Sequence, residues 1–156
     1  MKNLIFISIS IIIFSIVSFG FEVSGSYFME LSGYERTFYG LKVTFADKNI
    51  IGLELGVFSP TDIIETGEIT YLQPTTFILL QIPLKYLKIY GGISPIIQFY
   101  DNKFSLYSYT MYLTKAGIAL YLGPFVISGG MNTVFDLSFQ QTFGIYGIFA
   151  NLGFRF

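Results

Sequence analysis

The chain has 156 residues, which is enough for one domain, and it is 53% hydrophobic but only 12% charged. Since charged residues make up about a quarter of a typical soluble chain, a surface exposed entirely to water is not expected. The absence of Cys and His excludes disulfides and the commonest nitrogen and sulfur metal ligands, and no cofactor is expected. A net charge of −1 offers no basic surface for nucleic acid.

The first twenty residues have the pattern of a secretory signal peptide. Lys2 precedes an apolar run from Leu4 to Val17, and Ser18-Phe19-Gly20 then places small residues at the first and third positions. An uncleaved anchor is the alternative, because a membrane helix needs about 17 to 25 apolar residues. The serine content and the compact motif favour cleavage. We predict a signal peptide at residues 1–20 and a mature domain at residues 21–156.

The mature region alternates between apolar and polar residues, which is the period of a β-strand. The first predicted strand runs from about Glu22 to Leu31, and a polar loop follows at Ser32 to Thr37. One face of this strand is mainly polar and carries Glu22, Ser24, Ser26, Phe28 and Glu30. The other face carries Val23, Gly25, Tyr27, Met29 and Leu31.

The alternation from Phe38 to Phe58 predicts a hairpin with a turn at Asp47-Lys48-Asn49. Centring that turn on Lys48 places apolar residues opposite one another on one face, such as Val43 and Leu53. On the other face the only two charges in the strand bodies, Lys42 and Glu54, then lie directly opposite each other. The pattern therefore predicts a register and an ion pair together.

The next connection, Ser59 to Ile69, is the longest polar one and is acidic. We expect its Asp62, Glu65 and Glu68 to form an outer contact surface. A fourth strand from about Tyr71 to Leu84 and a fifth from Lys88 to Tyr100 follow, joined near Tyr86-Leu87. Pro83 and Pro95 cannot donate to a strand ladder, so we expect each at a strand end or a bulge.

The last part of the chain contains three more predicted strands. They run from Tyr109 to Leu120, from Phe125 to Phe135 and from Phe143 to Phe156, with a loop at Asp101 to Ser108, a turn at Gly123-Pro124 and a connection at Asp136 to Ser138. In the closing strand, one parity is apolar throughout: Tyr146, Ile148, Ala150, Leu152, Phe154 and Phe156. The other parity carries Gly147, Phe149, Asn151, Gly153 and Arg155.

This closing strand, which stops on an aromatic residue, resembles the last strand of bacterial outer-membrane β-barrels. The segment QIPLKYLKIYGGISPI, Gln81 to Ile96, is similar to a hairpin of the same superfamily. The resemblance is to the small OmpX, OmpA transmembrane-domain and OmpW group. It implies an all-β fold, an eight-stranded antiparallel up-and-down transmembrane β-barrel, in the bacterial cell outer membrane. It also implies that Leu152, Phe154 and Phe156 present an insertion signal to the barrel-insertion machinery.

Closure of the sheet follows from physics as well, since a strand edge cannot be left unpaired in lipid. The short turns and both termini are expected on the periplasmic side, and the longer loops outside. Eight strands leave an interior just wide enough for side chains. We therefore expect a charge cluster centred on Lys42 and Glu54 with Lys115 nearby, and Arg155 meeting Glu22 across the seam. The remaining inward charge is Glu30.

These features predict a monomeric cell-envelope protein with a structural or surface-interaction role and an interior plugged by side chains. The first alternative is porin-like: a narrow pore, or an OmpW-like conduit for small or apolar solutes. Such a conduit needs an apolar inner wall or a lateral opening, which Phe28, Phe77, Ile96 and Phe149 could provide. The second alternative is a soluble lipocalin-like binding barrel. We expect no enzyme, because the serine hydrolases of outer membranes need a His base.

Overall fold

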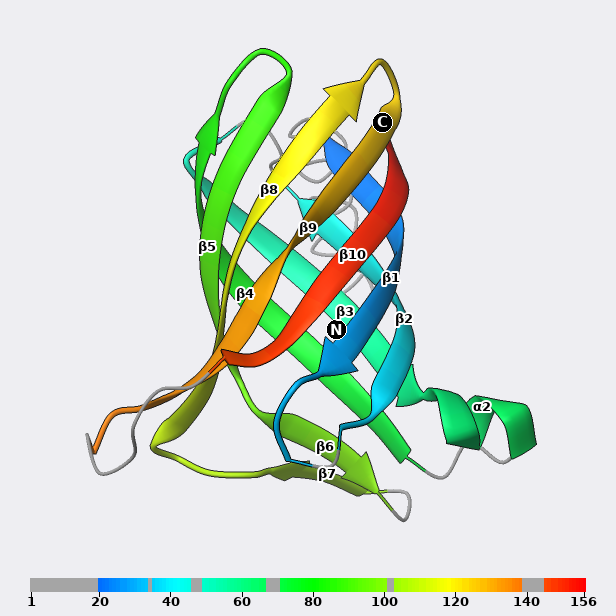
Figure 1. Ribbon diagram of the computed structural model, residues 1–156. Coiled ribbons are helices and arrows are strands. Elements are labelled where there is room, and N and C mark those ends of the chain that lie inside the picture. The colour runs from blue at the N-terminus through cyan, green and yellow to red at the C-terminus, as the bar shows by residue number, and fades with distance from the viewer. Residues whose placement is uncertain (1–19, 34, 46–48, 67–70, 101–102, 139–144) are drawn as a thin grey trace, which may run out of the picture.

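The computed structural model describes residues 20–33, 35–45, 49–66, 71–100, 103–138 and 145–156. Eight long antiparallel strands form a closed barrel, because the first strand, β1, pairs with the last, β10, and β3 pairs with β4 (Figure 1). The predicted all-β, eight-stranded antiparallel barrel is confirmed. The predicted signal peptide falls almost wholly outside the described residues.

The wall strands follow the order β3, β2, β1, β10, β9, β8, β5, β4 around the barrel. Their bounds are β1 (Phe21–Glu30), β2 (Thr37–Phe45), β3 (Ile51–Pro60), β4 (Tyr71–Pro83), β5 (Leu87–Pro95), β8 (Met111–Leu122), β9 (Phe125–Asp136) and β10 (Ile145–Arg155). Three short elements lie outside the wall: α2 (Thr61–Thr66), β6 (Ile97–Tyr100) and β7 (Lys103–Leu106). Among the described residues, no helix has the length and apolar character needed to cross a membrane.

The two ends of the barrel differ in their connections. The β4–β5 and β8–β9 turns and the C-terminus lie at the upper end of Figure 1, and α2 and the β6–β7 hairpin lie at the lower end. We call these the turn end and the loop end. The β8–β9 turn consists of Gly123 and Pro124, as predicted, and Gly123 has a φ of 65°, in the left-handed region that glycine adopts without strain.

Charge is confined to the inside of the wall. The eight wall strands carry four acidic and four basic side chains: Glu22, Glu30, Glu54, Asp136, Lys42, Lys88, Lys115 and Arg155. All are buried except Arg155, which is partly exposed. The balance in sign allows these charges to pair inside the wall, where burial makes an unpaired charge costly.

The outward face of the wall is apolar, and none of the described wall strands places a charged side chain there. Its exposed residues include Val23, Tyr27, Leu41, Leu53, Leu55, Ile78, Leu80, Ile82, Ile89, Ile93, Ile118, Leu120, Ile127, Met131, Ile148 and Leu152. A soluble barrel has the opposite distribution, with charge outside. The period-2 faces predicted from the sequence are therefore those of a barrel that faces lipid.

The predicted register of the β2–β3 hairpin is wrong by two residues. Lys42 lies opposite Gly56 and Thr44 opposite Glu54, so facing residue numbers sum to two more than predicted. A shift of two preserves which side chains point inward, so the hydrophobic pattern cannot detect it. Lys42 and Glu54 consequently meet as diagonal neighbours rather than as directly opposed residues.

Tyr146 departs from the parity predicted for the closing strand, which groups it with the outward residues Ile148 and Leu152. The β9–β10 ladder is irregular between Ile145 and Gly147, which is the sign of a β-bulge. The bulge lets the Tyr146 ring turn into the barrel, where its hydroxyl donates a hydrogen bond to Glu30. The remaining apolar residues of the closing strand keep their predicted outward parity.

The predicted fifth strand is divided in two. Pro95 ends β5 and Pro83 ends β4, so both prolines lie at strand ends as expected. After Pro95 the chain leaves β8 and forms the β6–β7 hairpin, so the predicted loop at Asp101 to Ser108 contains a strand. The predicted Ser59 to Ile69 loop likewise contains the last two residues of β3 and the helix α2.

Candidate functional site

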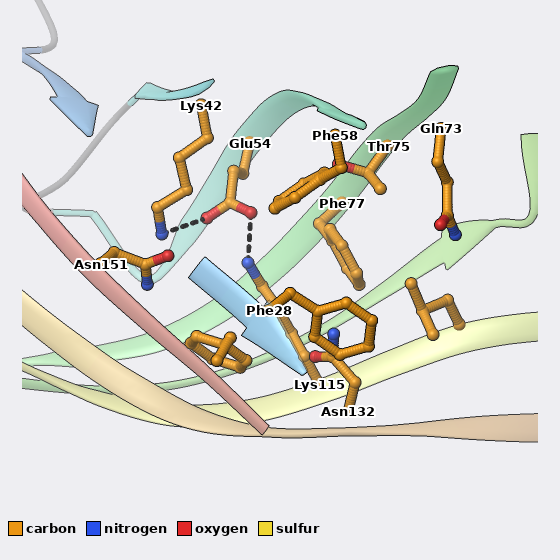
Figure 2. A pocket seen from close by; sticks show the side chains of 12 residues that line it. Phe28, Lys42, Glu54, Phe58, Gln73, Thr75, Phe77, Lys115, Asn132 and Asn151 are labelled. Atoms are coloured by element: carbon orange, nitrogen blue, oxygen red, sulfur yellow. Dashed lines mark hydrogen bonds and ion pairs between the residues drawn. The ribbon is translucent and has the colours of Figure 1, made fainter. Parts of the chain in front are cut away.

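The centre of the barrel is an ion-pair cluster around Glu54, which β3 points inward. Its carboxylate accepts hydrogen bonds from Lys42 Nζ on β2 at 3.1 Å and from Lys115 Nζ on β8 (Figure 2). Thr44 Oγ1 adds a contact at 3.4 Å. The Lys115 ammonium also lies 4.3 Å from the centre of the Phe77 ring. The two ammonium groups compensate the buried carboxylate and leave one positive charge in excess, and the Phe77 ring adds a cation–π contact to Lys115.

A second site, nearer the turn end, is built on Glu22 of β1. Its Oε1 accepts from Lys88 Nζ and from the Tyr121 hydroxyl, both at 2.7 Å. In the strand order, β1 and β5 are four steps apart in either direction. The Glu22–Lys88 pair therefore spans the barrel across its diameter.

A third site lies at the loop end around Glu30. Its carboxylate accepts hydrogen bonds from the Tyr146 hydroxyl, from the Arg36 backbone N–H at 3.2 Å and from Arg36 Nε at 3.4 Å. Arg36 belongs to the loop before β2. Partial burial opposes its charged form, but the hydrogen bond and the charge of Glu30 outweigh this, and the pKa of Arg36 is raised.

Asn151 of β10 connects strands across the seam. Its amide hydrogen-bonds Ser26 Oγ on β1 at 2.6 Å and Ser128 Oγ on β9 at 2.7 Å. The amide orientation that satisfies both neighbours also puts its oxygen 3.1 Å from Lys42 Nζ. The seam between the first and last strands is thus tied to the Glu54 cluster by polar contacts.

Three cavities lie in series along the interior. The cavity at the loop end has a volume of about 360 Å³, and an inner cavity next to it has about 30 Å³. Gln73 and Leu113 line both of them. The inner cavity, shown in Figure 2, shares Lys42 and Glu54 with a third of about 10 Å³. The two smaller cavities, which lie toward the turn end, have room only for water-sized molecules. Side chains therefore fill the barrel from the Glu54 cluster to the turn end.

The four residues predicted to supply an apolar conduit do point inward. Phe28, Phe77 and Phe149 line the inner cavity, and Ile96 lines the larger one. However, Figure 2 shows Phe28 and Phe77 among charged and amide side chains, including Lys115, Asn132 and Asn151. Phe77 belongs to an apolar cluster with Leu79, Tyr90 and Leu113, against which Phe149 and Ile96 pack. The charged and amide side chains around the inner cavity interrupt any apolar path along the axis.

The structure places the predicted inward charges in three places along the barrel. Lys42, Glu54 and Lys115 meet, whereas Glu22 and Glu30 lie in the separate sites described above. Arg155 faces Glu22 in the β1–β10 register, and its guanidinium lies 4.6 Å from the centre of the Tyr121 ring.

The other predicted sites lie at the two ends. Asp62 and Glu65 are exposed on α2 at the loop end, and Glu68 lies outside the described residues. Leu152, Phe154 and Phe156 are exposed at the turn end. The Phe156 and Phe21 rings stack, with 4.9 Å between their centres. The backbone N–H of Phe156 also donates a hydrogen bond to the carbonyl of Phe21.

Sequence reasoning missed the partners of two carboxylates. Lys88 has the same parity as the inward residues Tyr90 and Ser94, so its position was available in the pattern. Arg36 lies in a loop, where periodicity carries no information. Tyr121 lies just beyond the predicted end of its strand at Leu120, and β8 continues to Leu122.

A closed eight-stranded wall with an apolar exterior and compensated charges inside defines a class of fold: the small transmembrane β-barrel of the outer-membrane type. No family model matches the sequence, and neither does any curated protein.

Comparison with solved structures agrees with that class. The N-terminal barrel domain of Pseudomonas aeruginosa OprF superposes with a TM-score of 0.59 at 12% identity, over 88% of this chain and 98% of that one. A de novo designed transmembrane barrel gives 0.59 at 8% identity, over 88% and 96%. The Yersinia pestis outer membrane protein Ail gives 0.52 at 14%, over 88% and 99%. At such identities the likeness concerns the fold.

Proposed function

We propose that this chain is a monomeric, non-conducting barrel of the bacterial outer membrane with a structural or surface-interaction role. The observation that carries the proposal is the Glu22–Lys88 ion pair, at 2.7 Å, between strands on opposite sides of the barrel. A solute on the axis would have to separate two buried charges, which costs several kcal/mol. The Glu54 cluster is a second barrier on the loop-end side of this pair.

The location and partners are part of the same proposal. The apolar exterior supports outer-membrane lipid as the surrounding medium, and the exposed C-terminal residues support recognition by the barrel-insertion machinery. The loop end, with the exposed Asp62 and Glu65 of α2, is the surface proposed to face outward and contact other molecules. We propose no catalytic role.

The test is single-channel recording on the refolded mature chain in planar bilayers, with heat-modifiable gel migration as the control for folding. We expect a folded barrel that shows no unitary openings. Discrete openings of the wild-type protein, at a frequency proportional to the folded fraction, would contradict the proposal.

The second candidate is a narrow gated pore. The observation that favours it is the row of three cavities, since among the described residues only Lys42 and Glu54 line both of the two smaller ones. Recording Glu54→Gln beside the wild type separates the candidates. Openings that appear or change in this variant would identify the cluster as a gate, whereas silence in both supports the plugged barrel.

A further inference from the structure

The cavity at the loop end has the dimensions of a ligand site. Its volume of about 360 Å³ lies within the range of about 300 to 1,000 Å³ that is typical of small-molecule pockets. The walls come from the loop before β2, from β1, β4, β6, β8, β9 and β10, and from the segment after β7. Residues distant in sequence are thus brought to one concave surface, which the closed barrel holds in place.

The inner end of this cavity is closed, so a molecule that enters from the loop end cannot pass further into the barrel. Leu113, which is 5% exposed, and Gln73 separate it from the inner cavity, which has only about 30 Å³. The Glu54 cluster lines this inner cavity, on the side toward the turn end. The geometry supports binding at this end rather than passage through the barrel.

The charges in the cavity wall compensate each other. Among the described residues that line the cavity, Glu30 and Arg36 are the only ionic side chains, and they form an ion pair with 3.4 Å between Arg36 Nε and Glu30 Oε2. The Tyr146 hydroxyl donates a further hydrogen bond to Glu30. A charged ligand would find no spare opposite charge in the described wall to pair with. An uncharged ligand is therefore favoured.

The rest of the wall combines aromatic rings with amides. Tyr71, Tyr107 and Tyr146 provide aromatic rings, and Gln73 and Gln98 provide amide donors and acceptors. The Tyr146 hydroxyl is already bonded to Glu30, and Gln98 makes one hydrogen bond to Tyr71, which leaves its other amide groups for a ligand. Such a wall suits a ligand that has apolar C–H faces and many hydroxyl groups at its edges. An entirely apolar ligand would leave the amides without partners, at a cost for each.

We propose that the loop-end cavity is a binding site for a small uncharged saccharide of one or two rings. Tyrosine rings pack against the sugar C–H faces, and the two glutamine amides bind its hydroxyls. The inference goes beyond the proposed function, because it does not depend on whether the barrel conducts.

The test uses the mature chain refolded in a detergent without a sugar headgroup, such as dodecylphosphocholine. Glucose and maltose are titrated while the side-chain amide resonances of Gln73 and Gln98 are followed by NMR. Glucosamine and gluconate serve as charged probes, and cyclohexane as the apolar one. We expect saturable shifts with glucose or maltose, and binding at least about fivefold weaker for the other probes.

Matched variants assign the site. Tyr107 lines the cavity, whereas Tyr109 is exposed in the same segment and does not. Tyr107→Leu and Gln98→Leu should each weaken saccharide binding by about three- to tenfold, and Tyr109→Leu should leave it unchanged.

Three results would overturn the inference. One is the absence of saturable binding by either sugar up to its solubility limit. Another is equal binding by Tyr107→Leu, Gln98→Leu and Tyr109→Leu. The third is tighter binding of a charged or apolar probe, which would refute the ligand class. None of these results bears on the bilayer recordings, so the two proposals fail separately.

Discussion

Glu54 is buried between two lysine side chains, so removing its charge leaves both ammonium groups without a carboxylate. Breaking a buried ion pair by changing one partner costs about 3 to 5 kcal/mol. We therefore expect Glu54→Gln to lower the free energy of unfolding by about that amount. Urea unfolding of the barrel in lipid vesicles, followed by gel migration, measures the change.

Glu65→Gln is the matched control, because Glu65 is exposed on α2 and the same chemical change there should shift the unfolding free energy by less than about 0.5 kcal/mol. If both variants were as stable as the wild type, the Lys42–Glu54–Lys115 cluster would not hold the barrel together. The interior would then have to contain enough water to solvate the two lysines.

How far single residues can be placed from sequence depends on which rule positions them. Alternation placed Lys42, Glu54 and Lys115 inside, because the side-chain period of a strand is fixed at two. It failed at Tyr146, since a bulge inserts one residue and reverses the parity beyond it. Pairing across the lumen, such as Glu22 with Lys88, depends on barrel closure and strand stagger, which no local pattern encodes.

The inward-facing glycines leave space that neighbouring large side chains occupy. A Cβ on Gly92 would lie 2.7 Å from Leu79 Cδ2 and 3.3 Å from the Phe77 ring, and one on Gly130 would lie 2.8 Å from the Phe149 ring. Glycine therefore provides the space in which large side chains fill the barrel. The high content of Tyr and Phe and the high content of Gly are therefore related, because the rings fill the space that the glycines leave.

At the level of elements, the β2–β3 hairpin could be recognised but its register could not be fixed. Both registers place the same residues inside and both allow Lys42 to reach Glu54, so only the turn distinguishes them. In the structure Val43 lies opposite Leu55, whereas the turn centred on Lys48 would place Val43 opposite Leu53.

A pair of engineered cysteines decides between these registers without background, because the chain has no native Cys. We expect Val43→Cys with Leu55→Cys to form a disulfide on mild oxidation, since directly opposed residues have Cβ atoms about 4.5 to 5.5 Å apart. The control pair, Val43→Cys with Leu53→Cys, is diagonal and should stay reduced. Gel mobility before and after reduction reports the bond, and the reverse result would restore the turn centred on Lys48.

At the level of the whole molecule, one distribution explains both the composition and the fold. The few charges of the wall strands are balanced in sign and point into the closed barrel. The apolar residues of the same strands cover its outside. Closure depends on the seam, where β1 pairs with β10 along nine residues and Phe21 stacks on Phe156. The sequence predicted this closure because an open edge has no partner in lipid.

The same distribution predicts how the molecule responds to a charge on its exterior. Ile118 lies near the middle of β8 and is 50% exposed on the outward face. If lipid surrounds that face, Ile118→Arg should lower the free energy of unfolding in vesicles by about 2 to 4 kcal/mol, because arginine is costly near the bilayer midplane. Tyr109→Arg is the control, since Tyr109 lies outside the wall strands and its replacement should have little effect. A barrel surrounded by water would tolerate both changes equally, so equal stability of the two variants would remove the basis for placing this wall in a membrane.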